Sequence, residues 1–319
     1  MSNKQPENNA CHITSIGGQS VMEGVMMRGP KEIATAVRKS NGEIIIDKKP
    51  VNSFVSKHKF FKFPIIRGVV SFIDSMITGT KCLMFSAEQY DIEDGEAYEP
   101  SKFEKWLEDK WGDKIKDIAI YFAVVVAIFF SVGLFFVIPN ILVGFVRKLI
   151  TANIVLNLVE GAVRITIFLV YLALVSRMKD IQRVFEYHGA EHKTIATYEA
   201  GEELTTENAK KHSRLHPRCG TSFLLIVMVV SIIFFSFLKW ENPIERIVFR
   251  LLLLPIVAGV SYEIIKFAGR SKSKTVKILT MPGLWLQKLT TREPDESQLE
   301  VAIASLKAVL TDNKEDDKW

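Results

Sequence analysis

The sequence predicts a mainly α-helical polytopic membrane protein, with four transmembrane helices and a small cytoplasmic α+β region at its N-terminal side. Two observations support this fold class. Apolar residues make up 48% of the 319 residues and charged residues another 24%, so we infer that the two kinds are segregated along the chain. Four stretches are apolar over about 20 residues, the length that crosses a bilayer. A large soluble helical core is the alternative, but such long apolar runs are rare in soluble proteins.

Composition excludes several other classes of protein. The apolar content is too high for a disordered chain, and the pattern is not that of a coiled coil. A net charge of +5 is too small to indicate a nucleic-acid partner. Three cysteines are too few for a disulfide framework. The first 20 residues are polar, so we expect no secretory signal peptide.

Residues 1–117 form the predicted cytoplasmic region. Asn41-Gly42 separates two short apolar stretches, and both residues tolerate positive φ, so we expect a β-hairpin there. Over residues 65–85 apolar side chains recur at helical spacing. This pattern predicts a helix that either lies on the membrane surface or covers the small sheet. An acidic linker follows at residues 90–100, and a charged helix at residues 102–116 leads into the first span.

The transmembrane region covers residues 118–268. The first span begins at residue 118, and Pro139-Asn140 interrupts its uncharged run, so we expect the first helix to end there. The other three spans are predicted at residues 154–176, 221–238 and 247–268. The loop 177–220 joins the second span to the third.

A helical tail is predicted over residues 269–319. Ser297 and Glu300 have the spacing of a capping box at the start of its helix. Apolar residues then line one face of that helix: Leu299, Ile303, Leu306 and Leu310.

Lysine and arginine counts predict the orientation in the cell membrane. The segment before the first span carries 17 of them, the loop 177–220 carries eight and the tail after residue 268 carries nine. The two short hairpins between spans carry few. Since cytoplasmic loops are enriched in Lys and Arg, we expect both termini and the loop 177–220 in the cytoplasm.

The sharpest chemical motif is an H-x-x-E-H pattern, His188-Gly-Ala-Glu191-His192. On a helix, residues four apart share a face, so both imidazoles can bind one metal ion. Glu191 lies beside them and could act as general base toward a water on the metal, as in inverzincins. Gly189 weakens the prediction of a helix, and ordinary surface histidines are the alternative.

A second cluster, His216-Pro-Arg-Cys219, directly precedes the third span. His216 and Cys219 are both good ligands for zinc or a similar divalent ion. The two clusters lie at opposite ends of one loop between antiparallel spans, whose cytoplasmic ends can be close together. One metal site could therefore be formed by His188, His192, His216 and Cys219. With Cys219 bound the site is closed and structural, whereas without it a position stays open for water. Glu199, seven residues after His192, is a rival ligand.

A glycine-rich stretch near the N-terminus contains Glu23 and Arg28. Its spacing fits turns between short strands. The functional alternative is a binding loop that brings these two side chains to the metal region, where both are candidate catalytic residues.

In the second span, Glu160 and Arg164 form an i, i+4 pair. A charged pair that serves the packing between helices and a functional intramembrane site are equally open interpretations.

Four strings of the chain resemble the bacterial YqhQ-like family: GGQSVMEGVMMRGP, FEYHGAEHKTIATYEAGE, HPRCGTSF and LWLQKLTTREPDESQLEVAIASL. The resemblance runs from about residue 17 to the C-terminal helix. It implies a bacterial polytopic membrane protein of a family described as predicted metal-dependent enzymes. Its motif residues here are Glu23, Arg28, His188, Glu191, His192, His216 and Cys219.

Three hypotheses of function remain open. The first is a metal-dependent hydrolase at the cytoplasmic membrane face, holding a divalent ion, most simply zinc, with an unknown substrate. The second is a non-catalytic membrane regulator or assembly factor with a structural metal. The third is a transporter or an oligomeric channel, although the chain has no internal repeat. The expected partners are the lipid bilayer and a second copy or another membrane protein.

Overall fold

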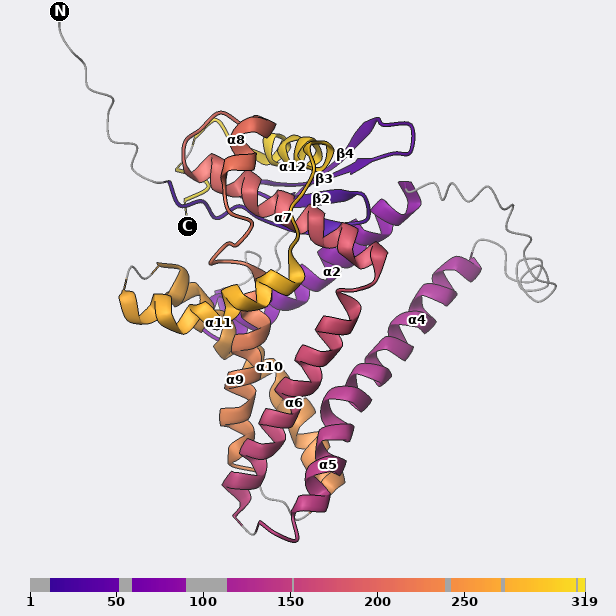
Figure 1. Cartoon of the computed structure of the whole chain (residues 1–319), viewed down its shortest axis with the longest axis vertical. Coiled ribbons are helices and arrows are strands. Elements are labelled where there is room, and N and C mark those ends of the chain that lie inside the picture. The colour runs from indigo at the N-terminus through magenta and orange to yellow at the C-terminus, as the bar shows by residue number, and fades with distance from the viewer. Residues whose placement is uncertain are drawn as a thin grey trace, which may run out of the picture. The chain divides into compact units, whose positions relative to one another are not determined.

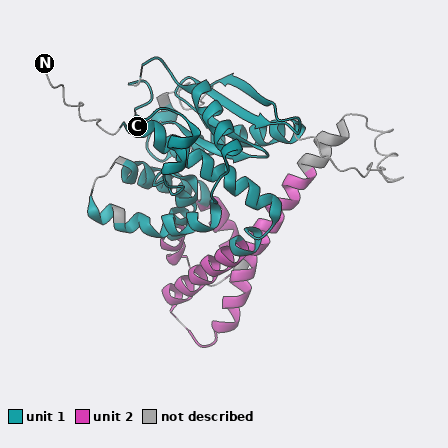
Figure 2. Ribbon diagram, turned by 45° about the horizontal axis from the view of Figure 1, so that its top comes forward, with its two compact units in different colours: residues 1–91, 172–230, 254–319 teal, residues 92–171, 231–253 magenta. Residues whose placement is uncertain are grey.

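The computed structural model describes residues 12–51, 59–89, 114–150, 152–238, 242–270, 273–313 and 315–318. The chain divides into two compact units, and Figure 2 colours them separately. Unit 1 comprises residues 1–91, 172–230 and 254–319, and unit 2 comprises residues 92–171 and 231–253. The predicted linker at 90–100 and most of the helix at 102–116 lie outside the described residues.

Unit 1 contains a four-stranded antiparallel sheet in the order β1-β2-β3-β4. Its strands are β1 (Gly17–Val21), β2 (Gly24–Arg28), β3 (Glu32–Arg38) and β4 (Ile44–Pro50). The predicted hairpin is confirmed between β3 and β4, where Arg38 pairs with Ile44. Gly42 has a φ of +86°, a value that glycine adopts without steric cost.

Helices cover both faces of this sheet. On one face lie α7 (Lys179–Glu199) and α12 (Glu296–Val309), around a core that includes Val25, Met27 and Leu299. On the other face lies α2 (Ile66–Gln89), whose Cys82 packs with Val21 and Met26. Of the two positions predicted for this amphipathic helix, the structure shows it covering the sheet (Figure 1).

The tail helix α12 begins two residues earlier than the predicted capping box. Its N-cap is Asp295, which accepts a hydrogen bond from the Gln298 backbone, while the Gln298 side chain accepts one from the Asp295 backbone. The prediction of Ser297 and Glu300 was therefore wrong. An aspartate caps as well as a serine, and glutamine completes the box as well as glutamate. The predicted apolar face is confirmed, with Leu299, Ile303 and Leu306 buried.

Within the described residues, four helices are long and apolar enough to cross a membrane: Ile66–Gln89, Phe122–Val146, Asn153–Val175 and Ile244–Gly269. Three of them coincide with predicted spans. The predicted span at 221–238 corresponds to α9 (Gly220–Ser236), which at 17 residues is shorter than the others. The fourth is α2, which is the least apolar of the four helices and packs one of its faces on the sheet.

The expectation that Pro139 ends the first helix was wrong. The helical path runs from α4 (Lys114–Val132) through a π-helical segment (Gly133–Val137) into α5 (Ile138–Val146). Pro139 stands at the first turn of α5, where a missing N–H and a fixed φ are tolerated. The π-helical segment absorbs the local mismatch in hydrogen bonding.

The remaining helices are α6 (Asn153–Val175), α8 (Thr206–Lys211), α10 (Pro243–Arg270) and α11 (Lys274–Thr290). Helices α6, α9 and α10 contribute residues to both units. In unit 2, α6 meets the end of α9 closely, since a Cβ at Gly161 would lie 2.5 Å from the Ile232 side chain. In unit 1, α2 meets α10 through Gly68 and Gly259.

Candidate functional site

The H-x-x-E-H motif lies on α7, with its helical geometry intact. Gly189 does not weaken the helix here. It allows close packing, because a Cβ at this position would lie 2.0 Å from the backbone carbonyl oxygen of Arg292. His192 and Glu191 are buried, and His188 is partly buried on the same side of the helix. The motif therefore faces the interior of unit 1 rather than solvent.

Backbone carbonyls fix the orientation of both imidazoles. His188 Nδ1 lies 2.8 Å from the Thr290 carbonyl oxygen, and His192 Nδ1 lies 2.6 Å from the Arg214 carbonyl oxygen. A carbonyl only accepts hydrogen bonds, so each Nδ1 carries the proton and each Nε2 keeps its lone pair. Burial lowers the pKa of His192, which favours the neutral imidazole. Metal-binding histidines commonly have such a fixed tautomer.

Cys219 completes a group of three donor atoms. His188 Nε2 lies 3.2 Å from Cys219 Sγ, and the His188 and His192 ring centres are 4.4 Å apart. One ligand atom from each of the three residues falls within 4.8 Å of the others. Two imidazoles and one thiolate are a ligand set that zinc accepts, and three protein ligands leave one position open.

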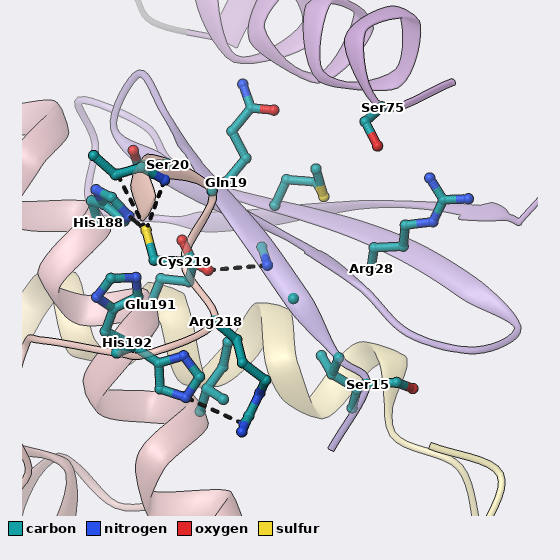
Figure 3. Close-up of a pocket in the computed structure, with 18 of the residues that line it drawn as sticks. Ser15, Gln19, Ser20, Arg28, Ser75, His188, Glu191, His192, Arg218 and Cys219 are labelled. Carbon is teal, nitrogen blue, oxygen red and sulfur yellow. Dashed lines mark hydrogen bonds between the residues drawn. The ribbon is translucent and has the colours of Figure 1, made fainter. Parts of the chain in front are cut away.

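Glu191 lies against the glycine-rich strand β1. Its Oε1 accepts a hydrogen bond of 3.0 Å from the backbone N–H of Gly18, a contact drawn as a dashed line in Figure 3. A Cβ at Gly18 would lie 2.9 Å from Glu191 Cδ, so glycine is needed for this approach. Burial raises the pKa of Glu191, while the neighbouring His188 and His216 oppose the shift. The carboxyl group is therefore poised to exchange a proton closer to neutral pH than an exposed glutamate.

His216 is in the same region but has other partners. Gln287 of α11 holds its backbone, donating to its carbonyl and accepting from its N–H, both at 2.8 Å. His216 Nε2 lies 3.5 Å from Glu199 Oε2, and Arg218 also pairs with Glu199. Burial alone would raise the pKa of Glu199, but the hydrogen bond to His216 and the charge of Arg218 hold it below its usual value. In this structure His216 and Glu199 lie beside the three donors rather than among them.

Glu23 and Arg28, the two candidates from the N-terminal stretch, lie in different places. Glu23 sits in the β1–β2 turn with a φ of 48° and pairs with Arg183 and the Tyr187 hydroxyl. It does not line the cavity at the motif. Arg28 does line it, across from the histidines in Figure 3, and pairs with Asp74 of α2 at 2.8 Å.

A cavity of about 480 Å³ connects these groups. Strand β1, helix α2, helix α7 and the start of α9 form its walls. Its chemically active lining residues are His188, Glu191, His192, His216, Arg218, Cys219 and Arg28. A space of this size is typical of small-molecule sites in proteins.

Sequence reasoning missed three residues that build the site. Gly18 holds Glu191, Thr290 orients His188, and Gln287 anchors His216. The structure buries the polar residues Gln287 and Thr290 of α11, and buried polar groups need hydrogen-bond partners, but this burial is not readable from the sequence.

Unit 2 contains a separate charged cluster. The predicted pair is confirmed, with Arg164 Nη2 3.0 Å from Glu160 Oε1. Glu160 also accepts hydrogen bonds from Arg246 and Arg250 of α10, each at 2.7 Å to Oε2. All four side chains are at most 7% exposed. The i, i+4 spacing in the sequence predicted Arg164 as a partner of Glu160, whereas the packing of α10 adds Arg246 and Arg250 as two further partners.

The fold and the site define a class of protein: a mainly helical chain whose described residues include four helices able to span a membrane and a small sheet, packed against a largely buried His-His-Cys group. The chain belongs to the family described as "Protein of unknown function (DUF1385)", whose model matches residues 63–312. It is 34% identical over 299 residues to "Uncharacterized protein YqhQ" of Bacillus subtilis (strain 168), covering 92% of each chain. These matches confirm the resemblance seen in the motifs. No solved structure matches the chain.

Proposed function

We propose that this protein is a metal-dependent hydrolase at the cytoplasmic face of the bacterial membrane, with His188, His192 and Cys219 as ligands of a divalent ion such as zinc. The observation that carries the proposal is the pair of backbone carbonyls that leave both Nε2 lone pairs available beside the Cys219 sulfur. The ion would supply a polarised water at its open position.

Glu191 is the proposed proton carrier. Its carboxylate would take one proton from the attacking water, whose oxygen would bond to the electrophilic carbon or phosphorus of the substrate. The bond to the leaving group then breaks, and Glu191 returns the proton to that group. The Gly18 N–H holds the carboxylate in place without neutralising it. Arg218 and Arg28 line the cavity and are placed to stabilise a developing negative charge.

Metal content and coordination of the purified full-length protein test this proposal. We expect about one bound ion in the wild type, with loss of tight binding in His188→Ala, His192→Ala and Cys219→Ser. Glu191→Gln should keep the ion and lose function in a complementation assay, because a general base is not a ligand. His212→Ala is the matched control, since His212 pairs with Glu202 outside the cavity.

The outcomes separate the hydrolase from a structural role. X-ray absorption should show three protein ligands and one water. Four protein ligands, with His216 as the fourth, would instead indicate a closed structural site and a non-catalytic regulator. A wild-type protein that binds no divalent ion would overturn both.

The proposed topology has a separate test. A cysteine introduced at Asn242, between α9 and α10, should react with an impermeant maleimide added outside intact cells. Cys219 should stay unlabelled in the same intact cells. The opposite pattern would place the cavity outside the cytoplasm.

A further inference from the structure

A second cavity of about 320 Å³ lies between the sheet and α2. It shares Arg28 and Thr78 with the cavity of the candidate site, so Arg28 stands where the two meet. Both cavities lie within unit 1. A ligand that enters the space between α2 and the sheet can therefore contact both sets of lining residues.

The lining of the two cavities favours an anion. Lys49 and Lys81 line the second cavity together with Arg28, and Arg218 lines the first. The carboxylates around the same spaces are Asp47, Asp74 and Glu191. Three of these cations already pair with a carboxylate: Arg28 with Asp74, Lys49 with Asp47 and Arg218 with Glu199. The attraction for an anion therefore comes from Lys81 and from the accessible part of Arg28, together with the proposed metal ion. Arg28 gives Asp74 one hydrogen bond through Nη2 and keeps 28% of its side chain exposed, so part of its guanidinium remains accessible.

The helices that wall these cavities carry apolar surface on their outer faces. On α2, Ser75 and Thr78 line the cavity, while Phe72, Ile73 and Met76 are exposed apolar side chains on the same helix. Phe72 also contacts Phe223 of α9, next to the cavity residue Thr221. These two helices are therefore side by side where they border the cavity.

Helix α11 repeats this arrangement. Leu286, Gln287 and Thr290 are buried toward the site, whereas its outer face exposes Ile278, Leu279, Met281, Trp285 and Leu289. An amphipathic helix with a wide apolar face of this kind is typical of the membrane interface. Apolar surface on α2, α9 and α11 thus adjoins a polar, cationic cavity.

We infer that the cavity receives the phosphate-bearing headgroup of an anionic membrane phospholipid, whose acyl chains stay with the apolar faces of α2 and α11. This inference rests on the proposed function, because it names the substrate class of the proposed hydrolase. The headgroup phosphate reaches Arg28 and the cations of the second cavity, and its phosphoester bond lies toward His188, His192 and Cys219. Hydrolysis would join the water oxygen to phosphorus and release the alcohol, which takes the proton held by Glu191. An ester of a membrane lipid supplies both the anion and the apolar part that the surrounding helices match.

Lipid selectivity of the purified full-length protein tests the inference. Spin-labelled phosphatidylglycerol and phosphatidylcholine are compared in nanodiscs, and the fraction of motionally restricted lipid is measured by electron paramagnetic resonance. We expect phosphatidylglycerol to be preferred by the wild type. Lys81→Gln should reduce that preference about fivefold, since one basic residue near a lipid surface contributes about that factor. Lys81→Arg should retain it.

Lys307→Gln is the control for general electrostatic attraction, because Lys307 is exposed on α12, outside both cavities. Equal losses in Lys81→Gln and Lys307→Gln, or no preference in the wild type, would overturn the inference. Free glycerol phosphate is added as competitor, and full displacement of the lipid by it would identify a soluble phosphate ester as the ligand instead. Metal content is measured on the same samples. Bound metal without lipid preference refutes the lipid inference alone, whereas absent metal refutes the proposed function.

Discussion

Replacing Gly18 by alanine should damage the candidate site, while the same change at the adjacent Gly17 should not. A Cβ at Gly18 would lie 2.6 Å from the Met26 backbone carbonyl oxygen and 2.9 Å from Glu191 Cδ. Nothing lies within 4 Å of a Cβ at Gly17. The two variants add the same methyl group to neighbouring positions of β1, so they form a matched pair.

The expected loss of stability in Gly18→Ala follows from these contacts. The strand pair β1–β2 cannot easily widen, so the Glu191 carboxylate must move away from its 3.0 Å hydrogen bond with the Gly18 N–H. Overpacking of a tight interior costs about 1–3 kcal/mol. At roughly 2–4 °C for each kcal/mol in a large domain, the apparent Tm of Gly18→Ala should fall by roughly 2–12 °C. Gly17→Ala should stay within about 0.5 kcal/mol of the wild type.

Thermal unfolding followed by tryptophan fluorescence in detergent measures this difference. Complementation by the same variants then reports whether displaced Glu191 affects function. If Gly18→Ala unfolds at the same temperature as Gly17→Ala and complements equally well, then β1 does not position Glu191.

Two further predictions concern the buried cluster of unit 2 and the cap of α12. Glu160→Gln should cost about 3–5 kcal/mol, because it leaves three buried guanidinium groups without their shared carboxylate, whereas Arg164→Gln leaves Glu160 paired with two arginines. A double-mutant cycle measured by denaturant unfolding checks this, and additive losses would show that Glu160 and Arg164 are not coupled. Asp295→Ala should destabilise α12 by about 1 kcal/mol and Ser297→Ala by less, since Asp295 accepts the hydrogen bond from the Gln298 backbone. Burial opposes ionisation of Asp295, but hydrogen bonds from Ser297 and Gln298 lower its pKa below 3.8. The ionised Asp295 side chain therefore stabilises the folded protein above about pH 4, and this stabilisation is lost as the pH falls through the lowered pKa. Equal losses in Asp295→Ala and Ser297→Ala would remove Asp295 as the cap.

Short-range patterns in the sequence determined the elements that carry the chemistry. The H-x-x-E-H spacing places His188 and His192 on one face of α7, and Asn41-Gly42 marks the β3–β4 turn. Apolar periodicities predicted the helices α2 and α12, and the structure shows that both pack on the sheet. These features are readable because each depends on residues within one or two helical turns, or within one hairpin.

Tertiary packing alone decided which distant residues meet at the site. Cys219 rather than His216 joins the two histidines, since Gln287 and Glu199 hold His216 to one side. Glu23 lies outside the cavity because the β1–β2 turn directs it to Arg183. In each case the partners are many residues apart in the chain. Their contact depends on how strands and helices pack rather than on any local spacing, so no local pattern in the sequence encodes it.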